Sequence, residues 1–177
     1  MILERSKTVC FTGHRPEKLP DGGDDDSPVI RAIKSCLYAE VEKAAAEGFD
    51  TFITGMQRGI DLWAGECVLD LMNSYDIHIA AAVPYRDFGK NFRGKDKWLF
   101  GRIIGNAEHI AYIDEEYQPG CMSRRNRYMV DHSSLLIAVR GTDKSGTSQT
   151  IGYAKRCGIE VRTIDISAYT DGQTSLF

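Results

Sequence analysis

Short runs of apolar residues alternate along the chain with longer segments in which apolar residues recur every three or four positions. The short runs are typical of strands buried on both faces, and they span residues 8–12, 50–54, 77–83, 109–113, 134–139 and 160–165. The longer segments predict amphipathic helices over residues 28–47, 60–71, 95–107, 124–132 and 147–157. This alternation predicts a parallel sheet with helices on both faces, joined by right-handed crossovers.

Local signals mark the ends of some of these helices. Ser27 is a natural N-cap with Pro28 at the first helical position, and Gly48 and Gly158 follow the predicted ends of two helices. No linker divides the 177 residues, so we expect a single domain over 1–177, with a polar tail from about residue 168. The expected fold class is α/β, a Rossmann-like three-layer sandwich with a mainly parallel sheet.

The composition is that of a soluble globular protein and disfavours several other classes. Hydrophobic residues make up 42% and charged residues 27%, and the net charge of −3 argues against a generic basic nucleic-acid binder. No apolar run is long enough to span a bilayer, and the first residues lack a signal peptide's apolar stretch, so we expect a cytoplasmic protein. The five cysteines form no C-x-x-C pair, which predicts reduced and mostly buried thiols, without a zinc site or disulfide framework.

Glycine or proline accompanies polar side chains directly after four of the predicted strands. In open α/β sheets, ligands bind in the crevice beyond the carboxyl ends of the strands, so we expect these loops to meet at one edge. The loops are Thr12-Gly-His-Arg-Pro16, Thr54-Gly-Met-Gln-Arg-Gly-Ile-Asp61, Pro84-Tyr-Arg-Asp-Phe88 and Arg140-Gly-Thr-Asp-Lys-Ser-Gly-Thr147.

The chemistry of these loops fits a ligand that contains phosphate. Glycine lets the backbone approach an anion, and a helix that begins directly afterwards points N–H groups and the positive end of its dipole toward it. Residues 55–59 and 145–147 each precede such a helix. Asp61 is a candidate acceptor for ribose hydroxyls or a cap for its own helix, and the candidates for charge-assisted bonds to phosphate are Arg15, Arg58 and Arg86.

Some of these residues have a purely structural alternative. Gly13 and Gly55 are also common turn formers after strands. His14 is as consistent with a hydrogen-bonded structural histidine as with an acid/base group or a ligand contact. The aspartates at 24–26 precede a helix N-terminus, where acids favour the dipole, and they lack the defined spacing of a metal site.

The aromatic residues also divide into candidates for a structural role and candidates for ligand contact. Trp63 and Trp98 lie in helical apolar stripes, which predicts core packing for both. Tyr85 and Phe88 directly follow a predicted strand, so they are the candidates for stacking on a base.

Three motifs resemble those of a known superfamily, in order and in spacing. Residues 54–61, 124–129 and 145–147 resemble the S-G-x-x-x-G-I-D loop, the R-R-N-R-x-I helix and the S-G-S/T turn of the DprA/Smf proteins. The segment 12–16, the short chain and the helix with Trp63 resemble more closely the YpsA-like family of the same SLOG superfamily. The resemblance implies a Rossmann-like fold and a nucleotide or nucleotide-derived ligand. For YpsA-like members it implies ligand sensing in bacterial cells.

The loops and the resemblance together give one set of expected ligand contacts, with no catalytic residue and no metal ligand among them. The R-R-N-R segment precedes a strand that ends in a glycine loop, which places it near the cleft. No cofactor is assigned; the expected ligand is of the nucleotide, NAD or ADP-ribose type, and the resemblance is compatible with a homodimer. The expected contacts are Gly13, His14, Arg15, Gly55, Met56, Arg58, Gly59, Asp61, Pro84, Tyr85, Arg86, Arg125, Asn126, Gly141, Ser145, Gly146 and Thr147.

Two further functions stay open as alternatives to a binding or sensing protein. One is a nucleotide N-glycosidase or transferase of the LOG type. LOG enzymes resemble P-G-G-x-G-T-x-x-E, and Thr150 replaces the glutamate that assists cleavage, which leaves Asp61 or Glu66 to substitute. The other is single-stranded DNA binding of the DprA type, which the net charge disfavours. It is favoured by a cluster of Arg124, Arg125, Arg127 and Lys144.

Overall fold

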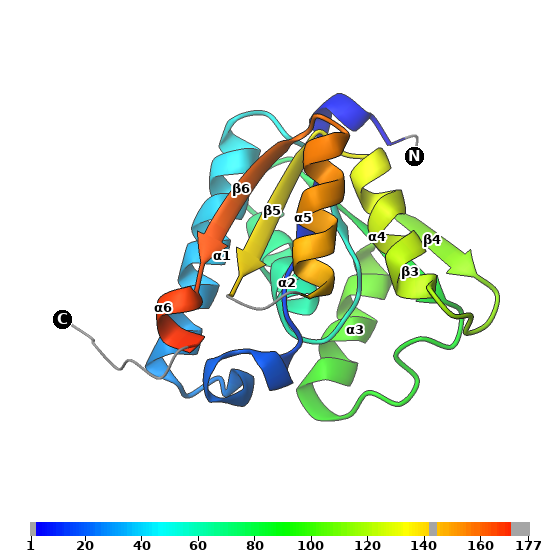
Figure 1. Ribbon diagram of the computed structural model, residues 1–177. Helices are drawn as coiled ribbons and strands as arrows, with labels where there is room; N and C mark the ends of the chain where they lie inside the picture. Colours follow the sequence, from blue (N-terminus) through cyan, green and yellow to red (C-terminus); the bar gives the residue numbers. More distant parts are fainter. Residues whose placement is uncertain (1–2, 142–144, 171–177) are drawn as a thin grey trace.

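Six parallel strands form one sheet in the computed structural model, which describes residues 3–141 and 145–170 (Figure 1). The strand order is β4-β3-β2-β1-β5-β6, and every neighbouring pair is parallel. This confirms the predicted α/β fold class and the parallel sheet. The strands are β1 (Thr8–Thr12), β2 (Thr51–Thr54), β3 (His78–Tyr85), β4 (His109–Asp114), β5 (Leu135–Arg140) and β6 (Glu160–Asp165).

Helices cover both faces of the sheet. In Figure 1, α4 (Cys121–Asp131) and α5 (Gly146–Arg156) lie in front of it, and α1 (Pro28–Ala46), α2 (Ile60–Leu71) and α3 (Gly94–Asn106) lie behind it. The short helices are η1 (Arg5–Lys7), η2 (Pro16–Lys18), η3 (Pro20–Gly23) and α6 (Ser167–Thr170).

Successive side chains of the central strand β1 belong alternately to two layers of the core. Val9 and Phe11 are fully buried in the cluster that includes residues of α1, α2 and α3. Cys10, between them, is fully buried in the second cluster, with residues of α4 and α5. Both layers are apolar because successive side chains of a strand point to opposite faces of the sheet.

The order in which strands are added to the sheet changes direction at β1. Strands β2, β3 and β4 extend the sheet on one side of β1, whereas β5 and β6 extend it on the other. The loops that leave β1 and β5 at their carboxyl ends therefore diverge to opposite faces and open a crevice between them. In folds of this kind, that crevice is where ligands bind.

The predicted helix caps are present at α1. The Ser27 hydroxyl accepts a hydrogen bond from the Ile30 N–H at 3.3 Å, and Pro28 occupies the first turn. Gly48 follows α1 with φ of +97°, and Gly158 follows α5 with φ of +71°. Both glycines adopt the left-handed conformation that residues with a Cβ disfavour, which is why the helices end there.

Two predicted boundaries differ from the structure by more than one residue. Helix α4 begins at Cys121 and not at residue 124, because Gly120 turns the chain with φ of +82° and Cys121 is already buried. Strand β3 continues through Pro84 to Tyr85, although proline was expected to end it. The missing N–H of Pro84 is tolerated because β2 ends opposite Ala81, so β3 has no partner on that side.

The two tryptophans differ in burial. Trp63 on α2 is 6% exposed and packs in the core as predicted. Trp98 on α3 is 55% exposed, so the core role predicted for it was wrong. Leu99 and Ile103 form the buried side of α3, and Trp98 lies outside that stripe, with the Arg102 guanidinium 4.8 Å from its ring centroid.

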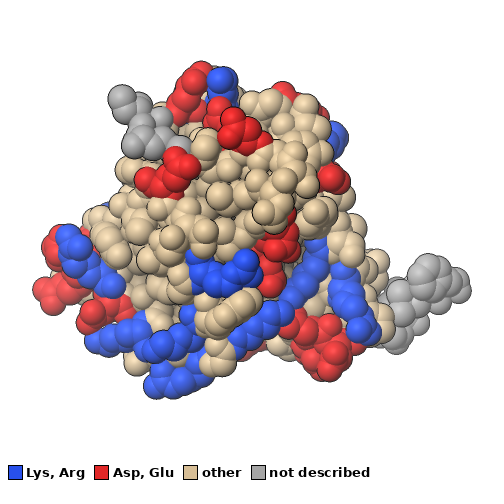
Figure 2. Space-filling model, turned by 180° about the vertical axis from the view of Figure 1, so that it is seen from behind, with Lys and Arg blue, Asp and Glu red and all other residues tan. Residues whose placement is uncertain are grey.

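The acidic run after η3 forms ion pairs. Asp25 pairs with Lys34 on α1 and with Lys95 on α3. Figure 2 shows the face that α1, α2 and α3 cover, with charged side chains of both signs and with Lys and Arg gathered in its lower part. Across residues 3–141 and 145–170, no group of three or more His, Cys, Asp or Glu side chains has an arrangement that would hold a metal ion.

The cysteines are free, as predicted. Cys10, Cys67 and Cys121 are buried, Cys157 is partly buried and Cys36 is exposed. None of the helices in the described ranges combines the length and the apolar character needed to cross a bilayer.

Candidate functional site

A small cavity of about 140 Å³ lies at the carboxyl ends of β1 and β5. The loop after β1 forms one wall, and the first turn of α5 forms the opposite wall. Residues from the start of α2 and from α4 complete it. The lining residues are Thr12, Gly13, His14, Arg15, Lys18, Gln57, Asp61, Met122, Arg125, Asn126, Ser145, Gly146 and Thr147.

His14 ties three loops together behind this cavity. Its side chain is buried, and Nε2 accepts a hydrogen bond from the Gly141 N–H at 3.3 Å, directly after β5. Its carbonyl oxygen accepts from the Ile60 N–H at 3.3 Å, at the start of α2. Because Nε2 is the acceptor, the ring proton lies on Nδ1 in this arrangement. His14 therefore positions the crevice, in agreement with the structural role that was one of its two interpretations.

The glycines after β1 and β2 are required by close packing. A Cβ on Gly13 would lie 2.5 Å from the Cβ of Ile60, and a Cβ on Gly59 would lie 2.5 Å from the carbonyl oxygen of His14. Gly59 also has φ of +84°. These glycines let the two loops approach each other, which a simple turn role would not require.

Asp61 and Arg125 form a buried ion pair beneath the cavity. Arg125 Nη1 lies 3.3 Å from Asp61 Oδ2, and the two side chains are only 6% and 7% exposed. Burial raises the pKa of Asp61, and the Arg125 guanidinium acts in the opposite direction. The Gln57 N–H donates to the same carboxylate oxygen at 3.3 Å. Asp61 thus anchors the loop after β2 to α4 and uses this oxygen internally.

Gly55 makes room for this ion pair. A Cβ on Gly55 would lie 2.4 Å from Arg125 Nη1 and 2.6 Å from Asp61 Oδ2. Contacts this short do not occur for real side chains, so the pair would have to move. The glycine that begins the G-x-x-x-G-I-D pattern is therefore explained by the charge pair packed against its Cα.

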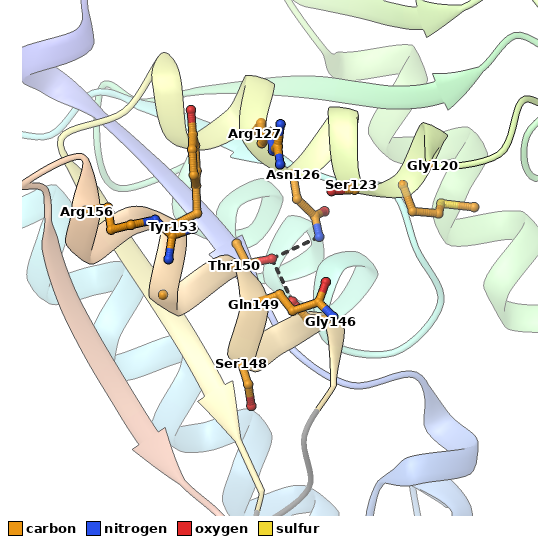
Figure 3. Close-up of a pocket in the computed structure, with 12 residues that line it drawn as sticks. Gly120, Ser123, Asn126, Arg127, Gly146, Ser148, Gln149, Thr150, Tyr153 and Arg156 are labelled. Atoms are coloured by element: carbon orange, nitrogen blue, oxygen red, sulfur yellow. Dashed lines mark hydrogen bonds between the residues drawn. The ribbon is translucent and has the colours of Figure 1, made fainter.

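A chain of hydrogen bonds runs from this pair to the first turn of α5. Arg125 Nε donates to Asn126 Oδ1 at 2.7 Å, and Asn126 Nδ2 donates to Thr150 Oγ1 at 2.9 Å. Thr150 Oγ1 in turn donates to the Gly146 carbonyl oxygen at 2.8 Å. The last two bonds are drawn in Figure 3. The network fixes α4 relative to α5, so the cavity walls are held in position.

The N-terminus of α5 faces the cavity without a side-chain cap. Ser145 occupies the cap position, yet its hydroxyl makes no capping bond. Ser145 Oγ is buried and has no hydrogen-bond partner in residues 3–141 and 145–170. Gly146 and Thr147 follow directly and line the cavity. A helix N-terminus presents unsatisfied N–H groups and a partial positive charge, so this wall suits an anion.

A larger cavity of about 540 Å³ lies next to this one, between α4 and α5 (Figure 3). Met122, Asn126 and Gly146 line both cavities, so the two are adjacent. The larger cavity is lined by Gly120, Met122, Ser123, Asn126, Arg127, Gly146, Ser148, Gln149, Thr150, Gly152, Tyr153 and Arg156.

Most of the expected contacts meet at this edge of the sheet. Gly55, Gly59 and Gly141 lie directly behind the cavity, in the contacts described above. Met56 is fully buried with φ of +64° and does not line it. The expected residues that do line the small cavity are Gly13, His14, Arg15, Asp61, Arg125, Asn126, Ser145, Gly146 and Thr147.

Other expected contacts lie elsewhere. Arg58 pairs with Glu17, and with Asp96 on α3, which covers the face of the sheet opposite to α4 and α5. Arg86 pairs with Glu115 at the end of β4. None of residues 84–88 lines the small cavity, and Tyr85, Asp87 and Phe88 line a different one.

Pro84, Tyr85 and Phe88 also lie away from the crevice. Tyr85 and Phe88 line a separate cavity of about 340 Å³, with their ring centroids 5.4 Å apart. Phe88 is only 7% exposed, so it belongs to the core and the stacking role considered for it was wrong. Pro84 is buried within β3.

The sequence did not single out several residues that line one or both cavities. One is Thr12, the last residue of β1. Another is Gln57, which lies within the 54–61 motif but was not among the residues selected from it. Lys18 and Met122 come from short helices or helix starts whose position depends on the tertiary fold. The missing LOG glutamate drew attention to Thr150, but its hydrogen bonds to two elements were not foreseen.

The sequence matches the model of a family described as the YspA SLOG family over residues 9–166. It is 26% identical to a UPF0398 protein of Bacillus cereus (strain B4264) over 148 residues, which are 82% of this chain and 80% of that protein. It is 31% identical to the uncharacterized SPbeta prophage-derived protein YoqJ of Bacillus subtilis (strain 168), over 73% of this chain and 84% of YoqJ.

A solved structure has the same fold. It is that of DNA processing protein A from Helicobacter pylori, described for its single-stranded DNA binding mode. The TM-score is 0.65 at 19% sequence identity, over 91% of this chain and 66% of that one. This chain therefore spans just under two thirds of the solved protein, and at this identity the similarity concerns the fold alone.

Proposed function

Because the chain belongs to the YspA SLOG family, we propose that it is a binding protein for a nucleotide-type ligand whose phosphate lies in the small cavity. The observation that carries the proposal is at the N-terminus of α5, where the buried hydroxyl of Ser145 at the cap position makes no capping bond and has no hydrogen-bond partner among residues 3–141 and 145–170. A phosphate oxygen in the cavity would accept from this hydroxyl and from the first N–H groups of the helix.

The charge of the cavity also supports an anionic ligand. Arg15, Lys18 and Arg125 line it, together with the carboxylate of Asp61. Asp61 and Arg125 are buried and paired with each other. The exposed charged side chains of the cavity are those of Arg15 and Lys18, and both are cationic. Cationic side chains beside a helix N-terminus form charge-assisted hydrogen bonds to phosphate.

The sizes of the two cavities fit the parts of a nucleotide. The small cavity of about 140 Å³ accommodates a phosphate group, whereas the adjacent cavity of about 540 Å³ lies in the range of about 300–1,000 Å³ that is usual for small-molecule sites. The nucleoside part of the ligand would therefore extend between α4 and α5.

The contacts of Thr150 support binding over hydrolysis. Thr150 occupies the place of the glutamate of LOG-type enzymes, and its hydroxyl is used in the bonds to Asn126 and Gly146. It is a structural link between two helices and offers no carboxylate to an oxocarbenium-like transition state. Asp61, the proposed substitute, is buried against Arg125.

The arginines of α4 have separate surroundings, which weakens the alternative of single-stranded DNA binding. Arg124 Nη2 lies 2.7 Å from Asp114 Oδ2, Arg125 is buried with Asp61, and Arg127 lines the cavity between α4 and α5. Lys144 lies outside the described residues. A continuous basic track for a phosphate backbone is not formed by these three side chains, so a small ligand is the better-supported function.

Calorimetry with AMP, ADP, NAD and ADP-ribose tests the proposal. Replacing Gly146 by Asp places a carboxylate at the first position of α5, where nothing lies within 4 Å of the added Cβ. We expect G146D to fold at least as stably as the wild type, because an acid at a helix N-terminus is favourable, but to lose nucleotide binding by charge repulsion.

A second variant and its control define the charge contribution. Arg15→Gln is expected to weaken binding roughly tenfold. Arg93→Gln, at the N-cap of α3 and outside both cavities, should leave the dissociation constant unchanged. If none of the four compounds binds the wild type, or if Arg15→Gln and Gly146→Asp bind as well as it does, the proposed function is wrong.

A further inference from the structure

The larger cavity has a cationic far end. Arg127 on α4 and Arg156 on α5 lie on opposite walls of it, near Tyr153 (Figure 3). Their guanidinium carbons lie 5.6 Å and 5.8 Å from the centroid of the Tyr153 ring. Neither arginine forms an ion pair with a carboxylate in the ranges 3–141 and 145–170. Two cations at one end of a cavity, neither of them paired with a carboxylate of the described residues, favour a bound anion.

Tyr153 engages the carboxylate that lies nearest to Arg127 along α4. Its hydroxyl donates to Asp131 Oδ1 at 2.8 Å. Asp131 lies one turn after Arg127 on α4, at the spacing where a carboxylate and a guanidinium often pair. Because Tyr153 engages this carboxylate, Arg127 stacks on the ring instead. Stacking fixes the planar guanidinium groups in advance, which favours recognition of a phosphate or carboxylate.

The distance between the two anion positions follows from the geometry of α5. A Cβ on Gly152 would lie 3.5 Å from Arg156 Nη1, so the guanidinium reaches back along the helix to the level of Gly152. Gly152 follows Gly146, which lines the phosphate cavity, by six residues. At a rise of about 1.5 Å per residue, the two positions are roughly 9 Å apart along the helix axis.

We propose that the ligand has a second anionic group, roughly 9 Å from the phosphate held at the α5 N-terminus, which Arg127 and Arg156 bind. The ligand class is thus an elongated, doubly anionic nucleotide derivative, with a second phosphate or carboxylate at its far end. The inference rests on the proposed function, because it assigns the other end of the same ligand. Between the two ends, Asn126, Gln149 and Ser123 provide polar groups for the intervening part.

Bisphosphates of different lengths test the proposed spacing between the two anion positions. The affinities of ethane-, butane-, hexane- and octane-α,ω-diol bisphosphates are compared with that of butyl phosphate, by calorimetry on the full chain. We expect an optimum at the length that spans roughly 9 Å, with binding at least tenfold tighter than that of butyl phosphate, because the second anion binds at a high effective concentration.

Variants then assign the gain to the two arginines. The double replacement Arg127→Gln and Arg156→Gln should abolish the length optimum and leave the affinity for butyl phosphate unchanged. Arg124→Gln is the matched control, since Arg124 lies on α4 outside the cavity and is paired with Asp114. Both targets are exposed, and thermal unfolding checks that each variant keeps its fold.

The possible outcomes separate the two proposals. If butyl phosphate binds but no bisphosphate binds more tightly at any length, the second anion position is refuted and the phosphate site stands. If the optimum persists in the double variant, the far anion is held elsewhere and the assignment to Arg127 and Arg156 is refuted. If no phosphate ester binds at all, the proposed function itself fails, and this inference fails with it.

Discussion

At the scale of single residues, the packing around Gly55 explains a feature of the loop after β2. The Asp61–Arg125 pair lies directly against its Cα, and this pair joins the loop to α4 across 64 positions of the chain. Removing one member of a buried ion pair leaves the other uncompensated, so the pair must be accommodated as a unit. A side chain at position 55 is therefore excluded by charge geometry as well as by space.

The variant Gly55→Ala tests this packing. The added methyl would lie 2.4 Å from Arg125 Nη1, so we expect the free energy of unfolding to fall by about 1–3 kcal/mol in urea denaturation, as overpacked sites usually show. The control is Gly101→Ala on the exposed side of α3, where nothing lies within 4 Å of the Cβ position. It should raise the stability by about 0.5–1 kcal/mol, because alanine is the better helix former. Equal effects of both variants would contradict the explanation.

At the scale of elements, a hydrogen bond between two side chains links α4 to α5 beside the cavities. Asn126 donates to Thr150, and Thr150 donates to the carbonyl oxygen of Gly146, one turn earlier on its own helix. Thr150 is 3% exposed, and Asn126 is partly buried. Both cavities depend on this arrangement, since Asn126 and Gly146 line both of them.

Replacing Thr150 by Val is expected to lower the free energy of unfolding by about 0.5–1.5 kcal/mol, because the partly buried amide of Asn126 loses its partner. Thr150→Ser keeps the hydroxyl and should retain most of the bond network. Thr163→Val on β6 provides the matched control; this side chain is exposed, and its replacement should change stability by less than about 0.5 kcal/mol. Chemical denaturation measures the free energy of unfolding of each variant. A Thr150→Val variant as stable as the wild type would show that the Asn126–Thr150 bond does not stabilise the contact of α4 with α5.

At the scale of the whole molecule, the two-layer core determines which cysteines react. Burial raises the pKa of Cys10 to about 12, in the layer under α4 and α5. Burial likewise raises the pKa of Cys67, on α2, to about 12. Cys36 on α1 is exposed. Since the thiolate is the reactive form, the native fold should protect the first two thiols and leave Cys36 accessible.

Alkylation with iodoacetamide at about pH 8, followed by mass spectrometry, checks this expectation. Cys36 should be modified first in the native protein, whereas Cys10 and Cys67 should react only when the chain unfolds. The same reaction in concentrated urea, where all five cysteines are accessible, is the control. Modification of Cys10 at the rate of Cys36 under native conditions would show that the sheet opens far more readily than its core packing implies.

The sequence by itself determined the order of strands and helices, the parallel sheet and the edge at which the glycine loops meet. These follow from local rules, since the apolar period distinguishes strand from helix and the chirality of crossovers limits the topology. It also indicated Ser27, Gly48 and Gly158 as helix boundaries, because capping depends on neighbouring residues only.

Only the tertiary structure decided which of the loops share a cavity. The order β4-β3-β2-β1-β5-β6 places the loops after β1 and β5 together and keeps Arg86 at the far side of the sheet. It also paired Asp61 with Arg125 and left Trp98 exposed. These outcomes depend on contacts between residues far apart in the chain, and a local pattern of apolar and polar positions contains no information about such distances.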